Sequence, residues 1–369
     1  MKNLLIFCTL LFAIPSWAAP AQSSNTQTIT DVLGRSITLE LPAKRVVIGF
    51  YGEDYMAIGG EQSFDHVIGM SKEIWQKWRP KNWALYVKHR PSLATLPEVG
   101  KVDTQTFSVE KVISLKPDVL LLADWQYQAL KSEMPRFEAA GVHVVVVDYN
   151  AQTLERHIKS TQVIGELTGQ VHRAEVIAEQ YKVDTQLVFD RLAKANLPQP
   201  KVYVEYGFTG PQEYGYTFGA NMWGRMAMLA GGDNIAAPFI KWWGHLNPEQ
   251  VIAARPDVIF LTGTEFGKNE QSTLMGEGVS KSVAQQRLAG FEQRMGWASL
   301  PAVQNHRIYG MYHYGSRSIM DASMLQFMAK AMYPKLFADI HPEQKYRDFY
   351  AKYLPVTPTG TFMVSLQDK

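Results

Sequence analysis

Hydrophobic runs alternate with amphipathic segments along most of this chain, and the alternation predicts an α/β protein. Short runs rich in Val, Ile and Leu indicate buried strands, at residues 46–50, 67–70, 119–123, 142–147, 201–206, 258–262 and 307–311. Several of the segments between them repeat apolar residues at helical spacing. Continuous apolar strands that alternate with helices are typical of parallel sheets covered on both faces.

The longest helical pattern divides these strands into two series. It covers residues 153–195, with Gly165 and Gly169 as two points at which the helix is able to break. We therefore expect two α/β lobes joined by one long helix. The predicted boundaries are 29–151 for the N-terminal lobe, 152–197 for the connecting backbone helix, and 198–369 for the C-terminal lobe with its closing helices.

The N-terminal residues predict export from the cytoplasm. An apolar run at residues 4–14 is too short to span a bilayer and leads to a small-x-small pattern that ends at Ala18. We expect a cleavable signal peptide at 1–18, a disordered segment at 19–28 and a mature protein in the periplasm. Cys8 is the only cysteine and lies inside this signal, so the mature chain has no disulfide, thiolate metal ligand or cysteine nucleophile.

The composition narrows the class of partner. The formal net charge is only +2, which gives no strong field for nucleic acid or for an anionic membrane surface. No segment after the signal is apolar enough to cross a membrane. We expect a monomer that is not embedded in a membrane. Its aromatic residues, 12% of the chain, suit either a core or a binding site with flat walls.

One phrase occurs twice in the sequence. "VEKVISLKPDVLLL" begins at Val109 and "PEQVIAARPDVIFL" begins at Pro248, with Glu110 and Glu249 in register. Each copy predicts a short helix, a Pro-Asp turn that ends it, and a buried strand. This unit is common in α/β proteins, so two copies are able to arise from the general requirements of helix and strand formation alone. The match in register, at corresponding places of two lobes, favours duplicated architecture.

The order of several motifs carries a family resemblance. The motifs are "DVLGRSITLELPAKRVV", "VGKVDTQTFSVEKVISLKPDVLLLADW", "GGDNIAA", "LNPEQVIAARPDVIFLTG" and "WASLPAVQNHRIYGM". In this order the chain resembles the periplasmic substrate-binding proteins of iron-siderophore and vitamin B12-type ABC importers, the helical-backbone family of metal-chelate-binding proteins. The resemblance implies two Rossmann-like lobes with parallel sheets, a single rigid backbone helix, a ligand in the cleft between the lobes, and delivery to a permease without catalysis.

The same resemblance gives the repeated glutamates a role. In the family, one glutamate on each lobe docks into arginine pockets of the permease dimer, and the matching positions here are Glu110 and Glu249. A carboxylate near a helix N-terminus is favoured by the helix dipole and offers a fork for bidentate arginine. The alternative is that both are ordinary acids that stabilise the first turn of a helix.

The cleft of such a protein is expected beyond the carboxyl ends of the strands. The aromatic, cationic and imidazole side chains that follow the predicted strands or lie near them are our candidate ligand-binding residues: Tyr51, Tyr55, Lys101, Trp125, Tyr206, Tyr216, Trp223, Arg225, Trp242, Trp243, Tyr312, His313 and Arg317. Cations and flat aromatic rings suit an anionic, planar chelate. Any single aromatic among them is as easily a side chain partly buried under a loop.

These residues predict a ferric-siderophore-type chelate as the bound ligand, and no cofactor. Haem, a corrinoid, or a nickel or oxyanion complex remain alternatives within the same family. A bare metal ion needs several ligands that converge on one point, whereas the nine histidines are scattered. Only His313 follows a strand in a cleft-like position, where it is able either to coordinate a chelated metal or to serve as a hydrogen-bonded rim residue.

Two further segments have open interpretations. A tryptophan-rich insertion is either a flap over the cleft or an amphipathic helix packed on the first lobe; its tryptophans are Trp75, Trp78 and Trp83. A methionine stripe at four-residue steps predicts the core-facing side of a closing helix rather than a soft-metal site; it comprises Met320, Met324, Met328 and Met332.

A secreted α/β hydrolase is the rival class. The chain has no G-x-S-x-G elbow, no H-E-x-x-H motif and no phosphate-cradling glycine-rich loop. Glu53 and Asp54 are adjacent in sequence, so they need not face one site. We therefore predict a binding protein rather than an enzyme. A sensor or chaperone built on the same two-lobe fold is a third interpretation.

Overall fold

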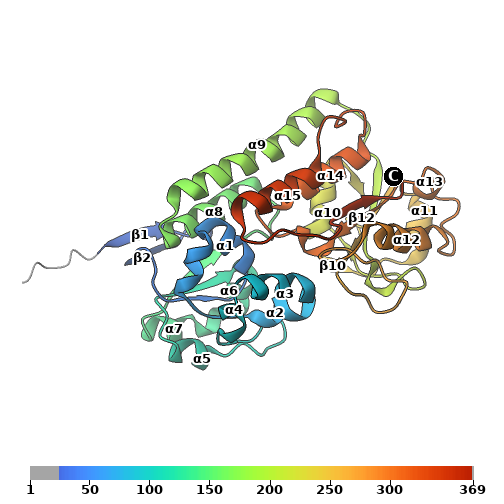
Figure 1. The fold of residues 1–369 in the computed structure, drawn as a ribbon. Coiled ribbons are helices and arrows are strands. Elements are labelled where there is room, and N and C mark those ends of the chain that lie inside the picture. The colour runs from blue at the N-terminus through green and yellow to red at the C-terminus, as the bar shows by residue number, and fades with distance from the viewer. Residues whose placement is uncertain (1–24, 368–369) are drawn as a thin grey trace, which may run out of the picture.

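The computed structural model describes residues 25–367 and contains two α/β lobes joined by long helices (Figure 1). The predicted signal peptide lies outside the described residues. Strand β1 (Thr26–Thr30) pairs antiparallel with β2 (Ser36–Glu40) in a hairpin around Gly34. The expected disorder over 19–28 is therefore wrong for residues 26–28, because the β2 ladder takes up their backbone hydrogen bonds.

The first lobe is built on a four-stranded parallel sheet in the order β4-β3-β5-β6. Every strand had been predicted from its apolar run. Their bounds are β3 Val46–Ile48, β4 Val67–Met70, β5 Val119–Ala123 and β6 His143–Val147. The helices are α1 Gly52–Gly59, α2 Lys72–Trp78, α3 Pro80–His89, α4 Ser92–Thr95, α5 Val109–Ser114, α6 Asp124–Ala129 and α7 Met134–Ala139, with 3-10 turns η1 Glu61–His66 and η2 Lys131–Glu133.

The second lobe has a larger, mixed sheet whose centre is parallel. Its order is β10-β8-β7-β11-β12-β13, and β9 also pairs with β7. The parallel strands β7, β11 and β12 were predicted; the antiparallel strands β8, β10 and β13 were not. The bounds are β7 Lys201–Tyr206, β8 Thr217–Phe218, β9 Asp233–Asn234, β10 Trp243–Gly244, β11 Val258–Gly263, β12 Ile308–Tyr312 and β13 Met363–Ser365.

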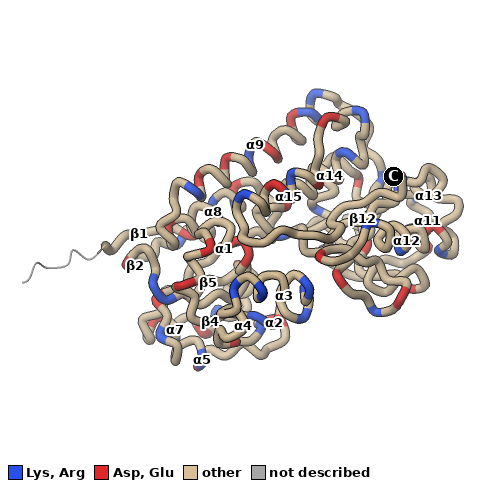
Figure 2. Tube along the Cα trace, viewed as in Figure 1, with Lys and Arg blue, Asp and Glu red and all other residues tan. Residues whose placement is uncertain are grey.

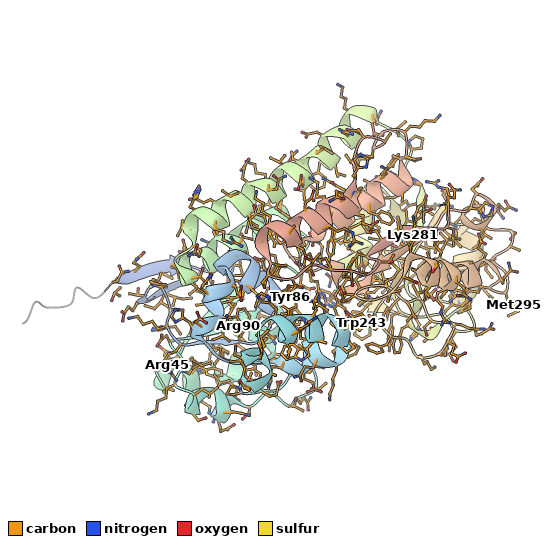
Figure 3. All side chains as sticks on the ribbon, in the orientation of Figure 1. Arg45, Tyr86, Arg90, Trp243, Lys281 and Met295 are labelled. Carbon is orange, nitrogen blue, oxygen red and sulfur yellow. The ribbon has the colours of Figure 1, made fainter. Side chains whose placement is uncertain are left out.

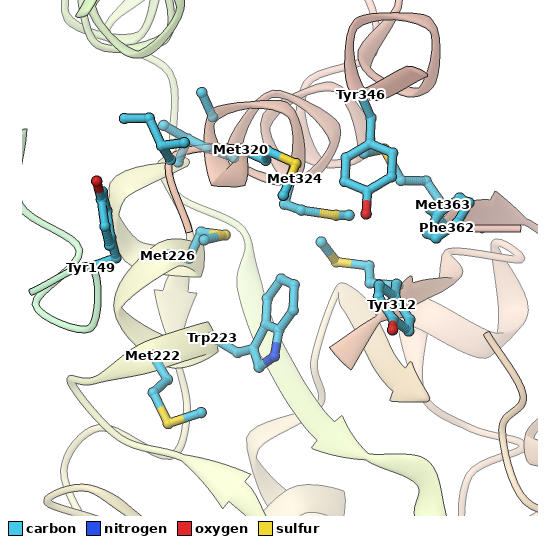
Figure 4. Close-up of a cluster of buried hydrophobic side chains, with 14 of the residues drawn as sticks. Tyr149, Met222, Trp223, Met226, Tyr312, Met320, Met324, Tyr346, Phe362 and Met363 are labelled. Carbon is cyan, nitrogen blue, oxygen red and sulfur yellow. The ribbon is translucent and has the colours of Figure 1, made fainter. Parts of the chain in front are cut away.

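Helices cover this second sheet and close the molecule. They are α10 Met222–Leu229, α11 Pro248–Ala254, α12 Lys281–Glu292, α13 Pro301–Gln304, α14 Asp321–Met332 and α15 Pro342–Tyr353, with 3-10 turns η3 Gly207–Thr209 and η4 His313–Gly315. The methionine stripe of α14 is buried, as predicted for a core-facing side. Figure 4 shows Met320 and Met324 in the same buried cluster as Trp223 and Tyr312.

The connection between the lobes is two helices, α8 (Leu154–Thr168) and α9 (Val171–Ala195), rather than one. Gly169 ends α8 in the left-handed conformation, at φ 69°, which is one of the two breaks that the sequence allowed. Helix α8 packs mainly on the first lobe and contacts the second through His157, which lies 3.0 Å from Asp321, whereas α9 packs along α14 of the second lobe (Figure 1). The 25-residue α9 is therefore the rigid connector.

The repeated phrase has the same structure in both lobes. In each copy a short helix, α5 or α11, precedes a central parallel strand, β5 or β11. The aspartate of each Pro-Asp turn accepts the backbone N–H at the start of the neighbouring strand: Asp118 from Arg45 at 2.9 Å, and Asp257 from Lys201 at 2.8 Å. These carboxylates satisfy donors that the sheet leaves unpaired, which explains why the phrase keeps its aspartate.

Charged residues of both signs are spread over both lobes and α9 (Figure 2). No single-sign face appears from this side, in keeping with the small net charge. Within residues 25–367, no helix combines the length and the apolarity that a membrane crossing requires.

Candidate ligand-binding site

The two lobes enclose a cleft of about 500 Å³, within the usual range for a small-molecule site. The first lobe lines it with Phe50, Ile74, Trp78, Lys101, Asp103, Trp125 and Asn150, and the second with Tyr206, Tyr216, Phe218, Asn221, Met222, Trp242, Trp243, His313, Tyr314 and Arg317. Figure 3 shows Trp243 beside the junction of the lobes. Because these residues follow β3, β5, β7 and β12, the cleft lies beyond the carboxyl ends of the strands.

The cleft has large aromatic side chains on both walls that remain partly open. Trp78 of the first lobe is 39% exposed, and Trp242 and Trp243 of the second are 58% and 57% exposed. Trp243 contacts Tyr216 edge to face, with ring centroids 4.8 Å apart. Exposed tryptophans gathered around one cavity indicate a ligand with a large flat apolar surface.

His313 lies at the floor of the cleft as a neutral imidazole. Burial, with a smaller contribution from Arg317, lowers its pKa to about 3. Its Nδ1 atom is 2.9 Å from Thr262 Oγ1, and its ring stacks on Tyr206 with centroids 4.2 Å apart. A neutral imidazole that is oriented through one nitrogen presents the other to the cavity as a hydrogen-bonding or metal-ligating atom.

Two cations face the cleft. Lys101 is buried, and its ammonium lies 3.4 Å from Asp103 and 5.4 Å from the centre of the Trp78 ring. Arg317 lies near Phe50, with its guanidinium carbon 5.9 Å from the ring centre. Within residues 25–367, Arg317 has no hydrogen bond or ion pair. Of these two cations, Lys101 is paired with Asp103 and Arg317 has no anionic partner among the described residues.

A smaller chamber of about 90 Å³ adjoins the inner side of the cleft. Phe50, Ile74, Tyr314 and Arg317 line both cavities. The chamber is more polar than the cleft; its other lining residues are Ile48, Tyr51, Gly52, Glu53, Asp54, Met70, Ser71, Trp75, Arg79, Ser316 and Ser318.

The walls of this chamber are tied together across the lobes. Glu53 accepts hydrogen bonds from Tyr86 of α3 at 2.7 Å and from Tyr350 of α15 at 2.8 Å, and pairs with Arg79 at 2.7 Å. Next to it, Asp54 accepts from the Ser318 hydroxyl at 2.7 Å. The two carboxylates at the start of α1 therefore fix the second lobe against the first.

The tryptophan-rich insertion also bridges the lobes. Its helices are α2 and α3, and the backbone N–H groups of Lys81 and Asn82 at the start of α3 donate to Glu265 of the second lobe, at 2.5 and 3.2 Å. Trp75 is buried and donates to Asn82, whereas Trp78 faces the cleft. The insertion is thus partly core and partly cleft wall, which neither sequence interpretation described alone.

The structure brings most of the predicted site residues together. Eight of them line the cleft: Lys101, Trp125, Tyr206, Tyr216, Trp242, Trp243, His313 and Arg317. Tyr51 lines the inner chamber, where its hydroxyl accepts the backbone N–H of Tyr149 at 3.3 Å.

Four predicted residues lie elsewhere. Tyr55 and Tyr312 are buried: Tyr55 packs on Phe64, and the Tyr312 hydroxyl accepts from Arg79 at 2.9 Å. Trp223 is fully buried, because α10 turns its indole inward to donate to the carbonyl of His313 at 3.2 Å. Arg225, also on α10, lines neither cavity. Proximity to a strand end was a misleading criterion for these four side chains.

Several cleft residues were missed. Phe50 had been assigned to the strand itself, but β3 ends at Ile48 and leaves Phe50 in the loop above it. Tyr314 follows β12, the same strand as His313, and fits the criterion used for the others. Asn150 follows β6, but an asparagine is not one of the aromatic, cationic or imidazole types considered. Phe218 and Met222 belong to β8 and α10, whose positions at the cleft depend on tertiary pairing.

The cleft contains no bare-metal site among the residues that the structure describes. Nowhere in 25–367 do three or more His, Cys, Asp or Glu side chains gather in a way that suits a metal ion.

The two repeated glutamates lie far from the cleft, one on each lobe. Both are exposed acids in the first turn of a short helix, Glu110 in α5 and Glu249 in α11. Glu110 pairs with Arg136 at 2.9 Å, an exposed contact that is easily exchanged for another partner. The side chain that caps each helix is a different one, Ser108 for α5 and Asn247 for α11.

Comparison with known proteins identifies the class that this geometry defines. The family model "Periplasmic binding protein" matches residues 69–313. The crystal structure of the TroA-like periplasmic binding protein FepB from Veillonella parvula superposes with a TM-score of 0.88, at 34% identity over 92% of this chain and 99% of that one.

Two curated relatives are also ligand-binding proteins. The molybdate-binding protein MolA of Haemophilus influenzae is 26% identical over 377 residues, which cover 96% of each chain. The ABC transporter substrate-binding lipoprotein YvrC of Bacillus subtilis is 26% identical over 249 residues, 66% of this chain and 70% of that one.

The chain belongs to the periplasmic binding protein family, with the TroA-like arrangement of two α/β lobes. It is the substrate-binding component of an ABC importer and not an enzyme. The family resemblance inferred from the motif order, the fold class and the absence of a catalytic role are thereby confirmed.

Proposed function

We propose that this protein captures a metal chelate, most specifically a ferric siderophore, in the periplasm after removal of residues 1–18, and delivers it to an inner-membrane permease. The observation that carries this proposal is the cleft itself: open tryptophans on both walls, a free Arg317 and a neutral His313 around about 500 Å³. Flat apolar walls with a net cation suit an anionic, aromatic-walled chelate.

Proteins of this family bind different ligands because the loops around a common fold differ.

Molybdate is a second candidate ligand, and one specific observation favours it. The relative that matches the chain over almost its whole length is named for molybdate binding. Against a bare oxyanion as the whole ligand stands the size of the cleft and its aromatic lining, which such an ion would leave largely unfilled.

A tryptophan-fluorescence titration tests the ligand class, because Trp78, Trp125, Trp242 and Trp243 all line the cleft. The panel is a ferric catecholate siderophore, a ferric hydroxamate siderophore, haem, cobalamin, a nickel–histidine complex and sodium molybdate. We expect saturable quenching with a Kd of about 1 μM or tighter for at least one ferric chelate, the range of a specific small-molecule site. Saturation by another member of the panel and by no ferric chelate would refute the siderophore assignment.

We further propose that Glu110 and Glu249 are the contacts with the permease dimer. Each is an exposed carboxylate at the N-terminus of a helix, in equivalent positions of the two lobes, and each helix has a separate side-chain cap. The carboxylates are therefore not needed as caps and are available for arginine side chains of a partner. We expect the protein to act as a monomer, because one chain already presents both acids.

A further inference from the structure

The inner chamber holds polar groups that the fold does not satisfy. Ser316 is 3% exposed, and its hydroxyl oxygen is buried without a hydrogen-bond partner. Its neighbour Arg317 has no hydrogen bond or ion pair within residues 25–367. Arg317 is half-buried, whereas the Ser316 hydroxyl is fully enclosed. Buried polar atoms are normally paired, so an enclosed unpaired hydroxyl beside an unpaired guanidinium in one cavity indicates a group that is absent from the free protein.

The backbone around the chamber is strained on both lobes. Tyr51, at the end of the β3 loop, has φ 60°, and Arg317, after η4, has φ 62°. A side chain beyond glycine seldom adopts this left-handed conformation, and such residues persist where the surroundings hold them in place for a function. Here two of them face one chamber from opposite lobes.

The other charged side chains that line the chamber already have partners within the protein. Arg79 is paired with Glu53 at 2.7 Å, and Asp54 accepts from Ser318 at 2.7 Å and from the backbone N–H of Ile319 at 2.9 Å. Ser71 donates to the carbonyl of Gly100. Arg317 is thus the cation left without an anion among the described lining residues, with the Ser316 hydroxyl beside it in sequence.

We propose that the inner chamber is an oxyanion subsite, in which Arg317 donates to a carboxylate or to a tetrahedral oxyanion and the Ser316 hydroxyl donates a further hydrogen bond. The planar guanidinium fits paired oxygens. The chamber, about 90 Å³, has room for such a group, and the bulk of a chelate would occupy the adjoining cleft of about 500 Å³. This inference rests on the proposed function only in taking the cleft as the ligand site.

The oxyanion has two chemical sources, a carboxylate carried by the chelate or a free inorganic oxyanion, and the experiment separates them. Wild-type protein is titrated with the ferric complex of 2,3-dihydroxybenzoate, the ferric complex of catechol, and sodium molybdate. The first two probes differ by a carboxylate. The variants are Arg317→Gln, Arg317→Lys and Ser316→Ala, with Arg225→Gln as a matched control because Arg225 lines neither cavity. Thermal melts verify that each variant is folded.

We expect the carboxylate-bearing chelate to bind at least tenfold tighter than the catechol complex if the chelate supplies the group. Arg317→Gln should then remove that preference, so that the two ferric complexes bind this variant with affinities within about twofold of each other, and Arg317→Lys should restore part of it. If the free oxyanion is the source, molybdate binds the wild type and Arg225→Gln alike, and is lost in Arg317→Gln. Equal weakening of every probe by Arg317→Gln would contradict the subsite.

A crystal of the wild type soaked separately in molybdate and in ferric dihydroxybenzoate decides the location independently of affinity. The expected result is an oxyanion within hydrogen-bond distance of Arg317 and Ser316 in at least one soak. If neither soak shows an oxyanion in the chamber, the subsite proposal is overturned, even if chelates bind in the outer cleft. Molybdate in the chamber, combined with no chelate binding, leaves the subsite standing and overturns the iron-chelate function.

Discussion

At the scale of single residues, the carboxyl group of Asp54 joins the lobes by accepting hydrogen bonds from Ser318 and Ile319. Burial raises its pKa to about 7, although hydrogen bonds from Ser318 and Ile319 act in the opposite direction. Glu53 adds to the increase and His157 opposes it. Asp54 therefore changes charge near neutral pH.

The sign of the effect on stability follows from linkage. An unfolded aspartate has a pKa of about 3.9, so between roughly pH 4 and 7 the folded protein holds a proton that the unfolded chain has released. This stabilising contribution is complete below pH 4 and is lost as pH rises through 7. Asp54→Asn should remove this contribution, because an amide does not titrate, while its oxygen still accepts from Ser318 and Ile319.

Urea unfolding of the two proteins at pH 5 and pH 8 checks this prediction. We expect the difference in unfolding free energy between the two pH values to shrink in Asp54→Asn relative to the wild type. Asp339→Asn is the control, because the hydrogen bond from Arg191 lowers the pKa of Asp339 to about 2 and leaves it charged at both pH values. An unchanged pH dependence in Asp54→Asn would contradict the role given to this carboxyl.

At the residue scale, some predicted site residues lie at the cleft because their direction follows from their strand. Trp125 and His313 come directly after buried strands, and both face the cleft. Trp223 of α10 and Tyr312 at the end of β12 are also aromatic, but each is held in the core by a partner distant in sequence, the His313 carbonyl for Trp223 and Arg79 for Tyr312. Composition near a strand end does not reveal such a partner.

At the scale of elements, the N-terminus of helix α3 ties the first lobe to the second. Its first N–H groups have no intrahelical partner, and Glu265 accepts those of Lys81 and Asn82. The carboxylate is also favoured by the dipole at this end of the helix. The contact holds Trp78, at the end of α2, against the cleft.

Glu265→Ala should therefore loosen the α2–α3 segment locally. We expect faster amide hydrogen exchange in residues 72–89, while β5 and β11 keep their protection, since both strands lie in the centre of their sheets. Hydrogen exchange followed by mass spectrometry measures the protection of these segments directly. The control is Glu213→Ala, which removes only an exposed pair with Lys268; protection of 72–89 equal in all three proteins would show that Glu265 does not fix α3.

The parallel strands and most of the longer helices were predictable from sequence, because apolar runs and helical spacing are local signals. The short strands β8, β10 and β13 were not, since each exists only through pairing with an edge of the second sheet. The contact between α3 and the second lobe could not be predicted for the same reason, because its acceptor, Glu265, lies in a loop of the other lobe.

At the scale of the whole molecule, the repeated helix–turn–strand unit places one exposed glutamate on each lobe. The double variant Glu110→Ala, Glu249→Ala should keep the wild-type affinity for ligand, because both residues lie outside the cleft and the chamber. Uptake through the cognate permease should fall at least tenfold, since two charge-assisted contacts are lost. Uptake is measured in cells with a radiolabelled ligand, beside ligand affinity in vitro.

The control for this experiment is Glu155→Ala, which removes another exposed acid from the first turn of a helix, α8, without a counterpart in the second lobe. We expect it to transport normally. Normal transport by the double glutamate variant as well would assign Glu110 and Glu249 to helix stabilisation alone.

The central claim is that one ligand is held between the two lobes, and paired variants of the opposing walls test it most directly. Isothermal titration with the tightest-binding chelate of the panel would compare Trp78→Ala of the first lobe, Trp243→Ala of the second, and the control Phe239→Ala, an exposed aromatic that does not line the cleft. The account predicts that each tryptophan variant weakens binding about tenfold or more while Phe239→Ala binds as the wild type does. Wild-type affinity in either tryptophan variant would contradict a ligand held by both lobes.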